Sequence, residues 1–506
     1  MKLDPSELYL KQYPDVKGAI ELGGVASALE HFLLYGRAEG RIWPDVPAAM
    51  SGGDDVLDAG EEPAAPVAHA CEAAQIAQGF VFIDGWLDDR YDRLDSLTLM
   101  VGEAAVPLRF GRRRRADVDT HFGSNTPHEF GFWAICSLDG PFLPANPRVR
   151  MRLASGNQIM MTPGVVTRSA TKSLFDTFLA AFGTRSIIGS VAARSFADLG
   201  RGAGQVLTDT YAIVRAAREV RSRCDYGASV TAPAISFICV LFGFPHFLFQ
   251  LVARFAQHGD VSGMEFIFSS NSPEFEEQLN RDAEIAAWLF GTSVSVLTMN
   301  DNTGFSHANN VAVRHARGGR ICIINPDVFP VDGNAVRALV AMDDEALGRD
   351  IAGGRLYYAD GTVMHEGMYF ERDAKLSGMA DISVWTVEHW RKGFPDRRDV
   401  APARVDAVSG ALMLMTRGTY ERLDGFREDF VYGHYEDADL CLRNEQDGGI
   451  TRYEPKLAFW HYEGMGSVKR PEHSGSGHYN RWLFSKKWAR ALDERAAHKS
   501  VPGIGR

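Results

Sequence analysis

The sequence has few cysteines, and none of them is spaced for a disulfide framework or a metal site. Its 506 residues contain six cysteines without a CxxC pair. They are scattered along the chain, several of them inside apolar runs: Cys71, Cys136, Cys224, Cys239, Cys322 and Cys441. This usage is typical of a reduced, cytoplasmic protein, and it argues against a disulfide-stabilised scaffold or a zinc knuckle.

The chain also lacks an excess of basic residues. Its 54 Lys and Arg are outnumbered by 65 Asp and Glu, which gives a formal net charge of -11. This balance argues against nucleic acid as a partner, because such binding commonly works through a general basic surface. Apolar residues make up 45% of the chain and charged residues 24%, as in globular proteins, and the length suggests about three domains.

An uninterrupted hydrophobic segment is missing as well. Residues 1–16 are polar and show no secretory signal pattern. Residues 234–255 are apolar over roughly the thickness of a bilayer, but Gly243, Pro245 and His246 interrupt them. A buried strand followed by a helix that begins near Pro245 explains this stretch better. We therefore expect a soluble protein, with at most peripheral contact at the inner face of the membrane.

Changes in composition and periodicity divide the chain into segments. Small, acidic, Pro and Gly residues before position 70 cannot bury enough apolar surface to fold. Short alternating strands separated by Gly, Asp and Pro follow, as in an antiparallel sandwich. The predicted organisation is a small helical module at 1–45, a flexible acidic linker at 46–70, a β-sandwich-like domain at 71–165, a helical connector at 166–230, an α/β domain at 231–490 and a tail at 491–506.

The α/β domain is predicted from strands that alternate with helices. Apolar runs at 235–240, 265–268, 294–297 and 321–324 are separated by helical patterns at 247–256, 274–289 and 306–317. Such alternation is typical of a largely parallel sheet, in which right-handed crossovers place every strand's C-terminal end on one edge. Ligands bind at that edge. Asn271, Asn302 and Asp327 follow three of these strands, so we expect them to converge there.

Asp327 is the residue at this edge with the clearest chemistry. It closes the tripeptide Asn325-Pro326-Asp327 directly after the run 321–324. A carboxylate in this place can hold a hard divalent cation, Mg²⁺ or Mn²⁺, that neutralises a departing diphosphate. The alternative is a turn-capping Asp, because Asn-Pro-Asp is also ordinary turn chemistry.

The second half of the chain carries a series of short motifs in a fixed order. They are Asn302, Gly304, Phe305, Ala308 and Asn310; Ala316 and Gly318; Asn325 to Val328; Asp360-Gly361; His365-Glu366-Gly367; Ser409-Gly410-Ala411; Gly425-Phe426; Tyr435 to Arg443; and His461. In order and spacing, residues from about 233 to 490 resemble the family-2 glycosyltransferases of the GT-A fold, close to the rhamnosyltransferase-like branch. The resemblance implies a metal-dependent, inverting enzyme of cell-surface polysaccharide biosynthesis. Such an enzyme transfers a hexosyl or deoxyhexosyl group from a nucleotide-sugar donor to a glycan or glycolipid hydroxyl.

The resemblance also implies a role for each matched residue. The donor-binding residues are Asn271, Asn302, Gly304, Asn310, Asn325, Asp327 and Gly410. The metal ligands are Asp327 and His461, although a lone His after an apolar strand is as often structural. Asp437 is the general base, and Glu436 binds or orients the acceptor. The alternative for these two acids is that they only stabilise the first turn of a helix.

Two positions depart from the family pattern. Asn271 stands where the family commonly has an Asp that reads the nucleobase and ribose, and Asn325 replaces the first acid of a DxD-type pair. Both changes remove a negative charge from the expected donor site. They leave a second interpretation open, in which the chain is a catalytically decayed protein that still binds glycans or nucleotide sugars.

Overall fold

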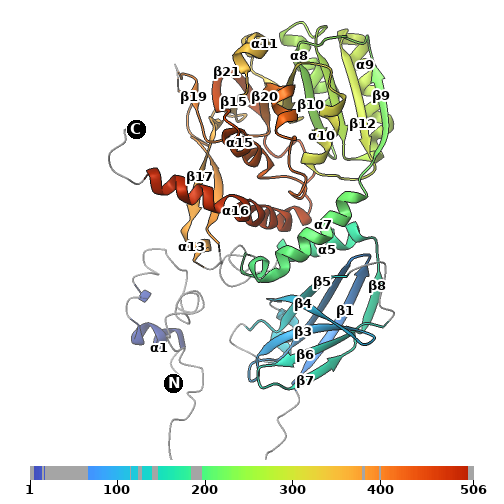
Figure 1. Cartoon of the computed structure of the whole chain (residues 1–506), viewed down its shortest axis with the longest axis vertical. Coiled ribbons are helices and arrows are strands. Elements are labelled where there is room, and N and C mark those ends of the chain that lie inside the picture. The colour runs from blue at the N-terminus through green and yellow to red at the C-terminus, as the bar shows by residue number, and fades with distance from the viewer. Residues whose placement is uncertain are drawn as a thin grey trace, which may run out of the picture.

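The structure, a computed structural model, describes residues 5–13, 16–17, 67–113, 115–122, 128–138, 146–183, 196–378, 382–397 and 400–499. These residues form two curled sheets with helices between and around them (Figure 1). Of the predicted N-terminal module the structure describes helix α1 (Pro5–Gln12) and a few following residues. The rest of that module and most of the predicted linker lie outside the described residues.

The first sheet has eight strands and corresponds to the predicted β-sandwich-like domain. Its strands are β1 (His69–Ala77), β2 (Phe80–Leu87), β3 (Leu94–Val101), β4 (Ala104–Arg113), β5 (Gly131–Ser137), β6 (Arg148–Leu153), β7 (Gln158–Met161) and β8 (Val165–Arg168), with the short helix α4 (Ala116–His121) between β4 and β5. They follow the order β7-β6-β3-β4-β5-β2-β1-β8, and only β1 and β8 pair in parallel. β4 pairs with β3 through its first half and with β5 through its second half, so a single curled sheet forms instead of two separate ones.

Strand β2 is buried on both of its faces. Val81 and Ile83 point into the core enclosed by the curled sheet, whereas Phe80 and Phe82 pack on the other side, against helices. Those helices are α5 (Thr171–Gly183) and α7 (Gly204–Ala216), which come from the predicted connector. The alternation of side chains along a strand thus lets one strand serve two cores.

The second sheet carries the α/β domain. Its strands are β9 (Val220–Tyr226), β10 (Ser236–Leu241), β11 (Glu265–Ser270), β12 (Ser293–Met299), β13 (Arg320–Ile324), β14 (Val328–Pro330), β15 (Ile351–Tyr357), β16 (Val363–His365), β19 (Ala403–Arg404), β20 (Leu412–Thr416) and β21 (Thr451–His461), and a separate ribbon pairs β17 (Met368–Asp373) with β18 (Val384–His389). The helices of this half are α8 (Phe247–His258), α9 (Glu276–Phe290), α10 (Phe305–His315), α11 (Gly333–Ala341), α12 (Asp344–Leu347), α13 (Ala374–Ser377), α14 (Arg417–Arg422), α15 (Glu436–Gln446) and α16 (Glu472–Lys499).

The predicted βαβ units are confirmed. β10, β11, β12 and β13 pair in parallel in the order β12-β11-β10-β13, with α8, α9 and α10 as their connections. The strand order reverses between β10 and β13, and ligands of open α/β sheets bind beside such a switch point. The apolar stretch 234–255 contains β10 and most of α8, as expected. None of the helices in the described part of the chain combines the length and hydrophobicity needed to cross a bilayer.

Two boundaries differ from the sequence prediction. The predicted connector was helical throughout, but Val220–Tyr226 forms strand β9, which pairs antiparallel with β12 at the edge of the α/β sheet. Its exposed Arg and Asp side chains suit an edge strand and obscure its apolar alternation. The predicted tail at 491–506 was also placed too early, because α16 continues to Lys499 and buries Leu492. Residues 500–506 lie outside the described residues.

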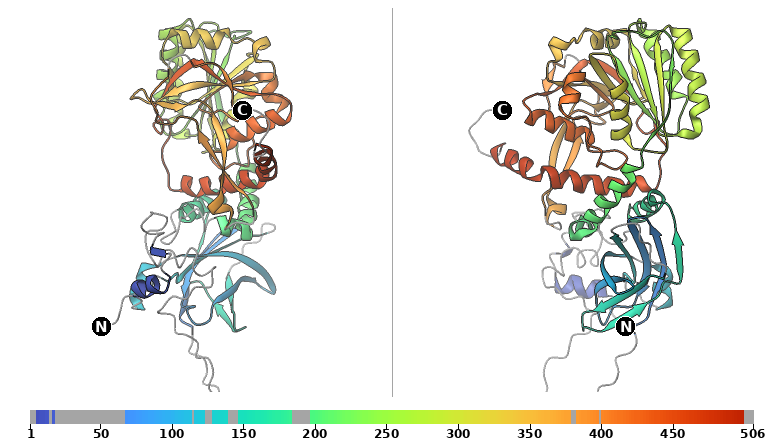
Figure 2. Two further views of the ribbon diagram at one scale, coloured as in Figure 1. Left: turned by 90° about the vertical axis from the view of Figure 1, so that its left-hand side faces the viewer. Right: turned by 45° about the vertical axis from the view of Figure 1, so that its right-hand side comes forward.

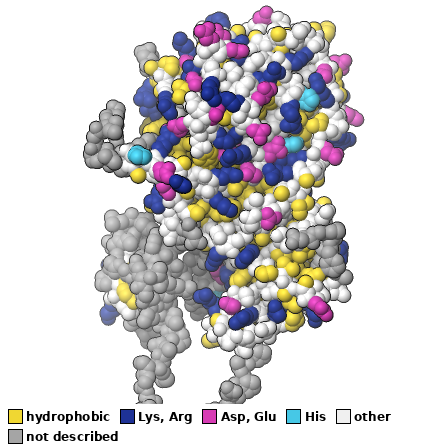
Figure 3. Space-filling view, viewed as in Figure 1, with side chains coloured by type: hydrophobic (Ala, Val, Ile, Leu, Met, Phe, Trp, Pro, Cys, Tyr) yellow, Lys and Arg dark blue, Asp and Glu magenta, His cyan; other side chains and the backbone are white. Residues whose placement is uncertain are grey.

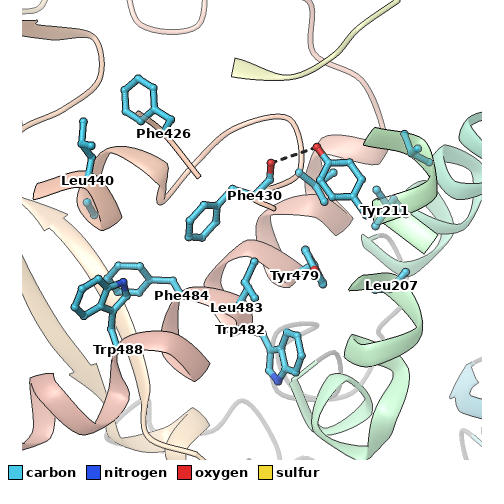
Figure 4. Close-up of a cluster of buried hydrophobic side chains, with 14 of the residues drawn as sticks. Leu207, Tyr211, Phe426, Phe430, Leu440, Tyr479, Trp482, Leu483, Phe484 and Trp488 are labelled. Atoms are coloured by element: carbon cyan, nitrogen blue, oxygen red, sulfur yellow. Dashed lines mark hydrogen bonds between the residues drawn. The ribbon is translucent and has the colours of Figure 1, made fainter. Parts of the chain in front are cut away.

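The two sheets share one hydrophobic core. Figure 2 shows α5 and α7 between the sheets, with α16 running across the bottom of the α/β domain. Side chains of α7, α16 and the segment before α15 point toward one another in Figure 4, and the Tyr211 hydroxyl donates to the Phe430 carbonyl at 3.3 Å. In Figure 3, hydrophobic side chains gather where the two halves of the molecule meet. The first sheet is therefore packed onto the α/β domain and is not suspended from a linker.

Candidate active site

The pairing of β14 with β21 brings Asp327 beside His461. In this pairing Val328 is opposite His461, and the Tyr462 amide donates to the Asp327 carbonyl at 3.1 Å. Asp327 is 2% exposed, and its Oδ2 accepts a hydrogen bond from the Gly466 amide at 2.8 Å. Its Oδ1 lies 3.5 Å from His461 Nε2. The two predicted metal ligands thus lie side by side, although 134 positions separate them in the sequence (461 − 327).

The chemistry of this pair fits a hard divalent cation. Asp327 Oδ1 is buried without a hydrogen-bond partner among the described residues, and the ring nitrogen that faces it is His461 Nε2. An octahedral ion with bonds of about 2.1 Å holds neighbouring ligand atoms about 3 Å apart, close to the observed separation. Within the described chain, no group of three or more His, Cys, Asp and Glu side chains is arranged to hold a metal. Mg²⁺-type sites often use one or two protein ligands and complete their shell with water and substrate phosphates.

The predicted base, Asp437, lies in the first turn of α15. Its Oδ2 accepts a hydrogen bond from the Gly410 amide at 2.9 Å. A Cβ atom at Gly410 would lie 3.3 Å from the Phe305 ring and 3.5 Å from Asp437 Cβ, so a larger residue would crowd both neighbours. Gly410 therefore allows the backbone to approach the carboxylate closely.

The segment Ser409–Ala411 connects the part of the candidate site that holds Asp327 to the part that holds Asp437. The Ser409 amide donates to His365 Nε2 at 3.4 Å, and the neighbouring Gly410 amide donates to Asp437. The Asn325 amide donates to the Ala411 carbonyl at 3.0 Å, which joins this segment to the tripeptide that ends in Asp327. Three consecutive residues thus tie the strand tip at β13 to the N-terminal end of α15.

Histidines lie next to this segment. His365 Nδ1 lies 2.8 Å from His389 Nδ1. Burial first, then the neighbouring His389 and His461, holds the pKa of His365 well below its usual value. Burial likewise lowers the pKa of His389, while the Asp437 carboxylate opposes that shift. Because these imidazoles are neutral, they do not offset the negative charges of Asp327 and Asp437. The resulting negative field favours the binding of a cation and the acceptance of a proton.

Glu436, the second predicted catalytic acid, is 5% exposed. Burial and then the negative charge of Asp437 raise its pKa from 4.5 to about 8. Its Oε2 is buried without a hydrogen-bond partner in the described part of the chain. At neutral pH Glu436 is therefore mainly a neutral acid that can donate a hydrogen bond, whereas its neighbour is placed to accept a proton.

This arrangement makes the stability of the protein depend on pH. The folded protein keeps the Glu436 proton up to about pH 8, while the unfolded chain loses it near pH 4.5. Between these values the folded state binds more protons, so the free energy of unfolding falls as pH rises. We expect Glu436→Gln to flatten this dependence by roughly 2–4 kcal/mol between pH 5 and pH 8. Urea unfolding at pH 5 and pH 8 measures the free energy of unfolding of both proteins. If this free energy changed by the same amount between the two pH values in the variant and in the wild type, the prediction would be contradicted.

Asp439, in the same helical turn, has a structural role. It is fully buried, and its carboxylate accepts from Arg427 at 2.9 Å, from Arg443 at 2.7 Å and from the Trp488 indole at 2.9 Å. A carboxylate that is fully buried among three such donors is out of reach of a substrate. The three acids in the first turn of α15 are thus in different environments, and Asp437 is the one that faces Gly410.

The predicted donor-binding residues that precede β13 in the sequence fall into two groups. Asn271 is buried, and its amide accepts from the Thr303 amide at 3.1 Å and donates to the Gly304 carbonyl at 3.3 Å. Asn302 accepts from the Gly304 amide at 3.1 Å, and Gly304 has a positive φ of 83°. These residues shape the turn between β12 and α10. That turn lies at the expected sheet edge, and donor contact by its residues stays a prediction.

Asn310 belongs to α10 and lies against the segment that follows α14. Its amide donates to the Phe426 carbonyl and to Glu428, both at 2.9 Å, and accepts from the Tyr420 hydroxyl at 2.6 Å. Gly425 packs against Asn310: a Cβ atom at Gly425 would lie 2.4 Å from Asn310 Oδ1. Asn310 thus uses its amide to fix the loop that leads toward α15. The predicted donor contact at this position has no support from this geometry.

Two residues of the site were not identified from the sequence. His389 ends β18 and reaches His365, and Asn480 of α16 binds the loop before α15. His389 belongs to a strand whose partner is local, so no motif marks it. Asn480 is a lone buried amide among aromatic residues of α16, and such a buried polar residue is the signal that could have singled it out.

Comparisons with known sequences give little further information. No family model matches the chain. A curated protein of Sinorhizobium fredii, "Uncharacterized protein y4gI", is 25% identical over 187 residues, which cover 36% of this chain and 20% of that protein. The chain thus matches only a fifth of that relative's length.

Several solved glycosyltransferase structures show a distant likeness. GalNAc-T7, solved with UDP, GalNAc and Mn²⁺, is 17% identical with a TM-score of 0.37, and the match covers 53% of this chain and 52% of that one. The mannosyltransferase PcManGT of Pyrobaculum calidifontis, with GDP-Man and Mn²⁺, is 13% identical with a TM-score of 0.32, over 64% and 88%. S. aureus TarS, with UDP-GlcNAc, is 12% identical with a TM-score of 0.32, over 48% and 60%.

Proposed function

We propose that this protein is a divalent-metal-dependent glycosyltransferase of the family-2, rhamnosyltransferase-like type. It would move a hexosyl or deoxyhexosyl group from a nucleotide-sugar donor to a glycan or glycolipid hydroxyl, in cell-surface polysaccharide biosynthesis at the cytoplasmic side of the membrane. The observation that carries the proposal is the segment Ser409–Ala411. It joins the Asp437 carboxylate to the strand tip of Asp327, which is paired with His461.

In this proposal each acid has one task. Asp437 accepts the proton of the acceptor hydroxyl as that oxygen attacks the anomeric carbon, and the bond to the diphosphate breaks in the same displacement. One base and no covalent intermediate give inversion at the anomeric carbon. Asp327 and His461 would hold Mg²⁺ or Mn²⁺, whose charge stabilises the departing diphosphate. Glu436 stays neutral and orients the acceptor by donating a hydrogen bond.

The second candidate is a protein that binds a glycan or nucleotide sugar without turnover. The geometry of Asn271 favours it to some degree, because its amide is occupied by the turn at Thr303 and Gly304 and has little left for a nucleobase. Asn325 also lacks the charge of a second acidic ligand. The two candidates differ in whether nucleoside diphosphate is released when an acceptor is present.

A donor panel tests the proposal. UDP-, dTDP- and GDP-sugars are added with and without Mn²⁺, and the unfolding temperature is measured. A donor at 100 times its dissociation constant stabilises the folded protein by about 2.7 kcal/mol, so the matching donor should raise the transition in a Mn²⁺-dependent way. Release of nucleoside diphosphate with a glycan acceptor then identifies an enzyme. Stabilisation without release supports the binding protein, and no response to any donor contradicts both candidates.

A further inference from the structure

The loop before Glu436 and Asp437 holds a costly backbone conformation. Tyr432, His434 and Tyr435 have φ values of 60°, 82° and 76°, in the left-handed region. This conformation is costly for a non-glycine residue and persists only when its surroundings impose it. The position of the two acids therefore depends on whatever holds residues 432–435.

Two of the anchors come from the α/β half of the molecule. The Asn480 side chain donates to the carbonyls of Val431 at 2.9 Å and Gly433 at 2.6 Å, and it accepts from the Val431 amide at 2.8 Å. The Phe305 amide donates to the Tyr432 carbonyl at 2.6 Å. These bonds fix the backbone around Tyr432 but leave its side chain free to be held by another element.

The third anchor comes from α5, which precedes the α/β domain in the chain. The Tyr432 hydroxyl donates to Asp176 Oδ1, and the other oxygen of Asp176 binds Lys172 at 2.8 Å. Lys172 also lies 3.5 Å from Asp301, in the turn before Asn302. Burial raises the pKa of Tyr432, which keeps its hydroxyl protonated as the donor. Asp176 is 21% exposed at its side chain, so this bond lies largely out of water.

A cavity of about 490 Å³ lies along this contact. It is lined by Lys172, Ser173 and Asp176 of α5, by Asp301, and by Arg470 and Glu472 at the start of α16. The contact between α5 and Tyr432 thus belongs to the same side of the sheet as the predicted donor turn. An element outside the α/β sheet forms one wall there.

Helix α5 is itself held firmly. Phe178 packs its ring on Phe82 at 5.4 Å and on Trp133 at 5.3 Å, which fixes the helix to the first sheet. On its other side the helix approaches α16 closely, since a Cβ at Gly183 would stand 2.4 Å from the Gly475 amide nitrogen. The first sheet, α5 and α16 therefore form a continuous support beneath the loop 432–435.

We infer that Asp176 is a positioning residue for the active-site acids: by holding the Tyr432 hydroxyl, it fixes the loop that presents Glu436 and Asp437. This inference rests on the proposed function for its kinetic consequence. On this inference, the first sheet and the connector contribute to catalysis because they support the loop that bears Glu436 and Asp437. They are then not only an attached binding domain.

The test uses the full chain with Tyr432→Phe, Asp176→Ala and the double variant. Ser173→Ala is the matched control, because it lines the same cavity from the same helix. We expect kcat to fall about 10- to 100-fold in each single variant, since small displacements of catalytic groups cost this much. The KM for donor should stay within about threefold, and the double variant should be no worse than either single one. Additive losses, or a wild-type kcat in Tyr432→Phe, would overturn the inference.

A second measurement does not depend on activity. Amide hydrogen exchange at residues 432–437 should speed up in both single variants and stay at the wild-type rate in Ser173→Ala, because the lost bond loosens this loop locally. Unchanged exchange in Tyr432→Phe would overturn the inference even if the wild-type protein proved inactive. An inactive wild type together with faster exchange would instead count against the proposed function alone, and support the positioning role.

Discussion

Replacing Asp437 by Asn is expected to lower the rate of sugar transfer by about a thousandfold, within the range that a general base contributes. The amide oxygen of Asn can still accept the hydrogen bond that the Gly410 amide makes at 2.9 Å. The fold and the donor site should therefore persist while the proton acceptor is lost. Initial rates of nucleoside diphosphate release measure the effect, and the donor-induced shift in unfolding temperature should match that of wild type.

Asp447→Asn serves as the control for this variant. Asp447 lies at the other end of α15, where it pairs with Arg349 at 2.8 Å and with Arg422, on the surface. The substitution removes the same charge from the same helix, and an exposed ion pair contributes at most about 1 kcal/mol. Its activity should equal that of wild type. If Asp437→Asn retained more than about a tenth of the wild-type rate, Asp437 would not be the base.

The parallel half of the α/β sheet was predictable because its signals are local. Each of β10, β11, β12 and β13 is an apolar run ended by a polar turn, and right-handed connections then place their C-terminal ends together. The turn at Asn302 and the tripeptide ending in Asp327 follow from this pattern alone. By contrast, the neighbour of Asp327 depends on the pairing of β14 with β21, which no local periodicity encodes. Only the family resemblance pointed to His461.

Asn310, Asn480 and Asp176 are polar residues whose partners lie far away in the sequence. Asn310 matches a family motif, but its amide is bound to Phe426, Tyr420 and Glu428, more than a hundred positions away. Asn480 and Asp176 hold the loop before α15 from α16 and α5. A motif records which residue type a site needs and not which partner it meets. The strained loop at 432–435 could not be read from its sequence, since a bulky residue such as Tyr432 or Tyr435 rarely adopts a positive φ.

Replacing Asp327 by Ala is expected to abolish the dependence on Mn²⁺ and to lower the transfer rate by about two to three orders of magnitude, the loss seen when charge stabilisation of a transition state is removed. The reason is that Oδ1 of this 2% exposed carboxylate is the unpaired oxygen beside His461. Initial rates across a Mn²⁺ titration measure the effect, together with the Mn²⁺-dependent part of the donor-induced shift in unfolding temperature.

Asp332→Asn is the control for the removal of a negative charge from a position close to Asp327 in the sequence. Asp332 lies five positions further on and caps α11, where its carboxylate accepts from the Asn334 amide at 2.8 Å and the Ala335 amide at 3.1 Å. Asn is an equally good capping residue, so this variant should keep its stability and its response to Mn²⁺.

His461→Ala should weaken the Mn²⁺ response less than Asp327→Ala, because it removes a neutral ligand and leaves the charged one. If Asp327→Ala responded to Mn²⁺ as wild type does, the ion would have to bind elsewhere, and Asp327 would be a turn residue held by the Gly466 amide.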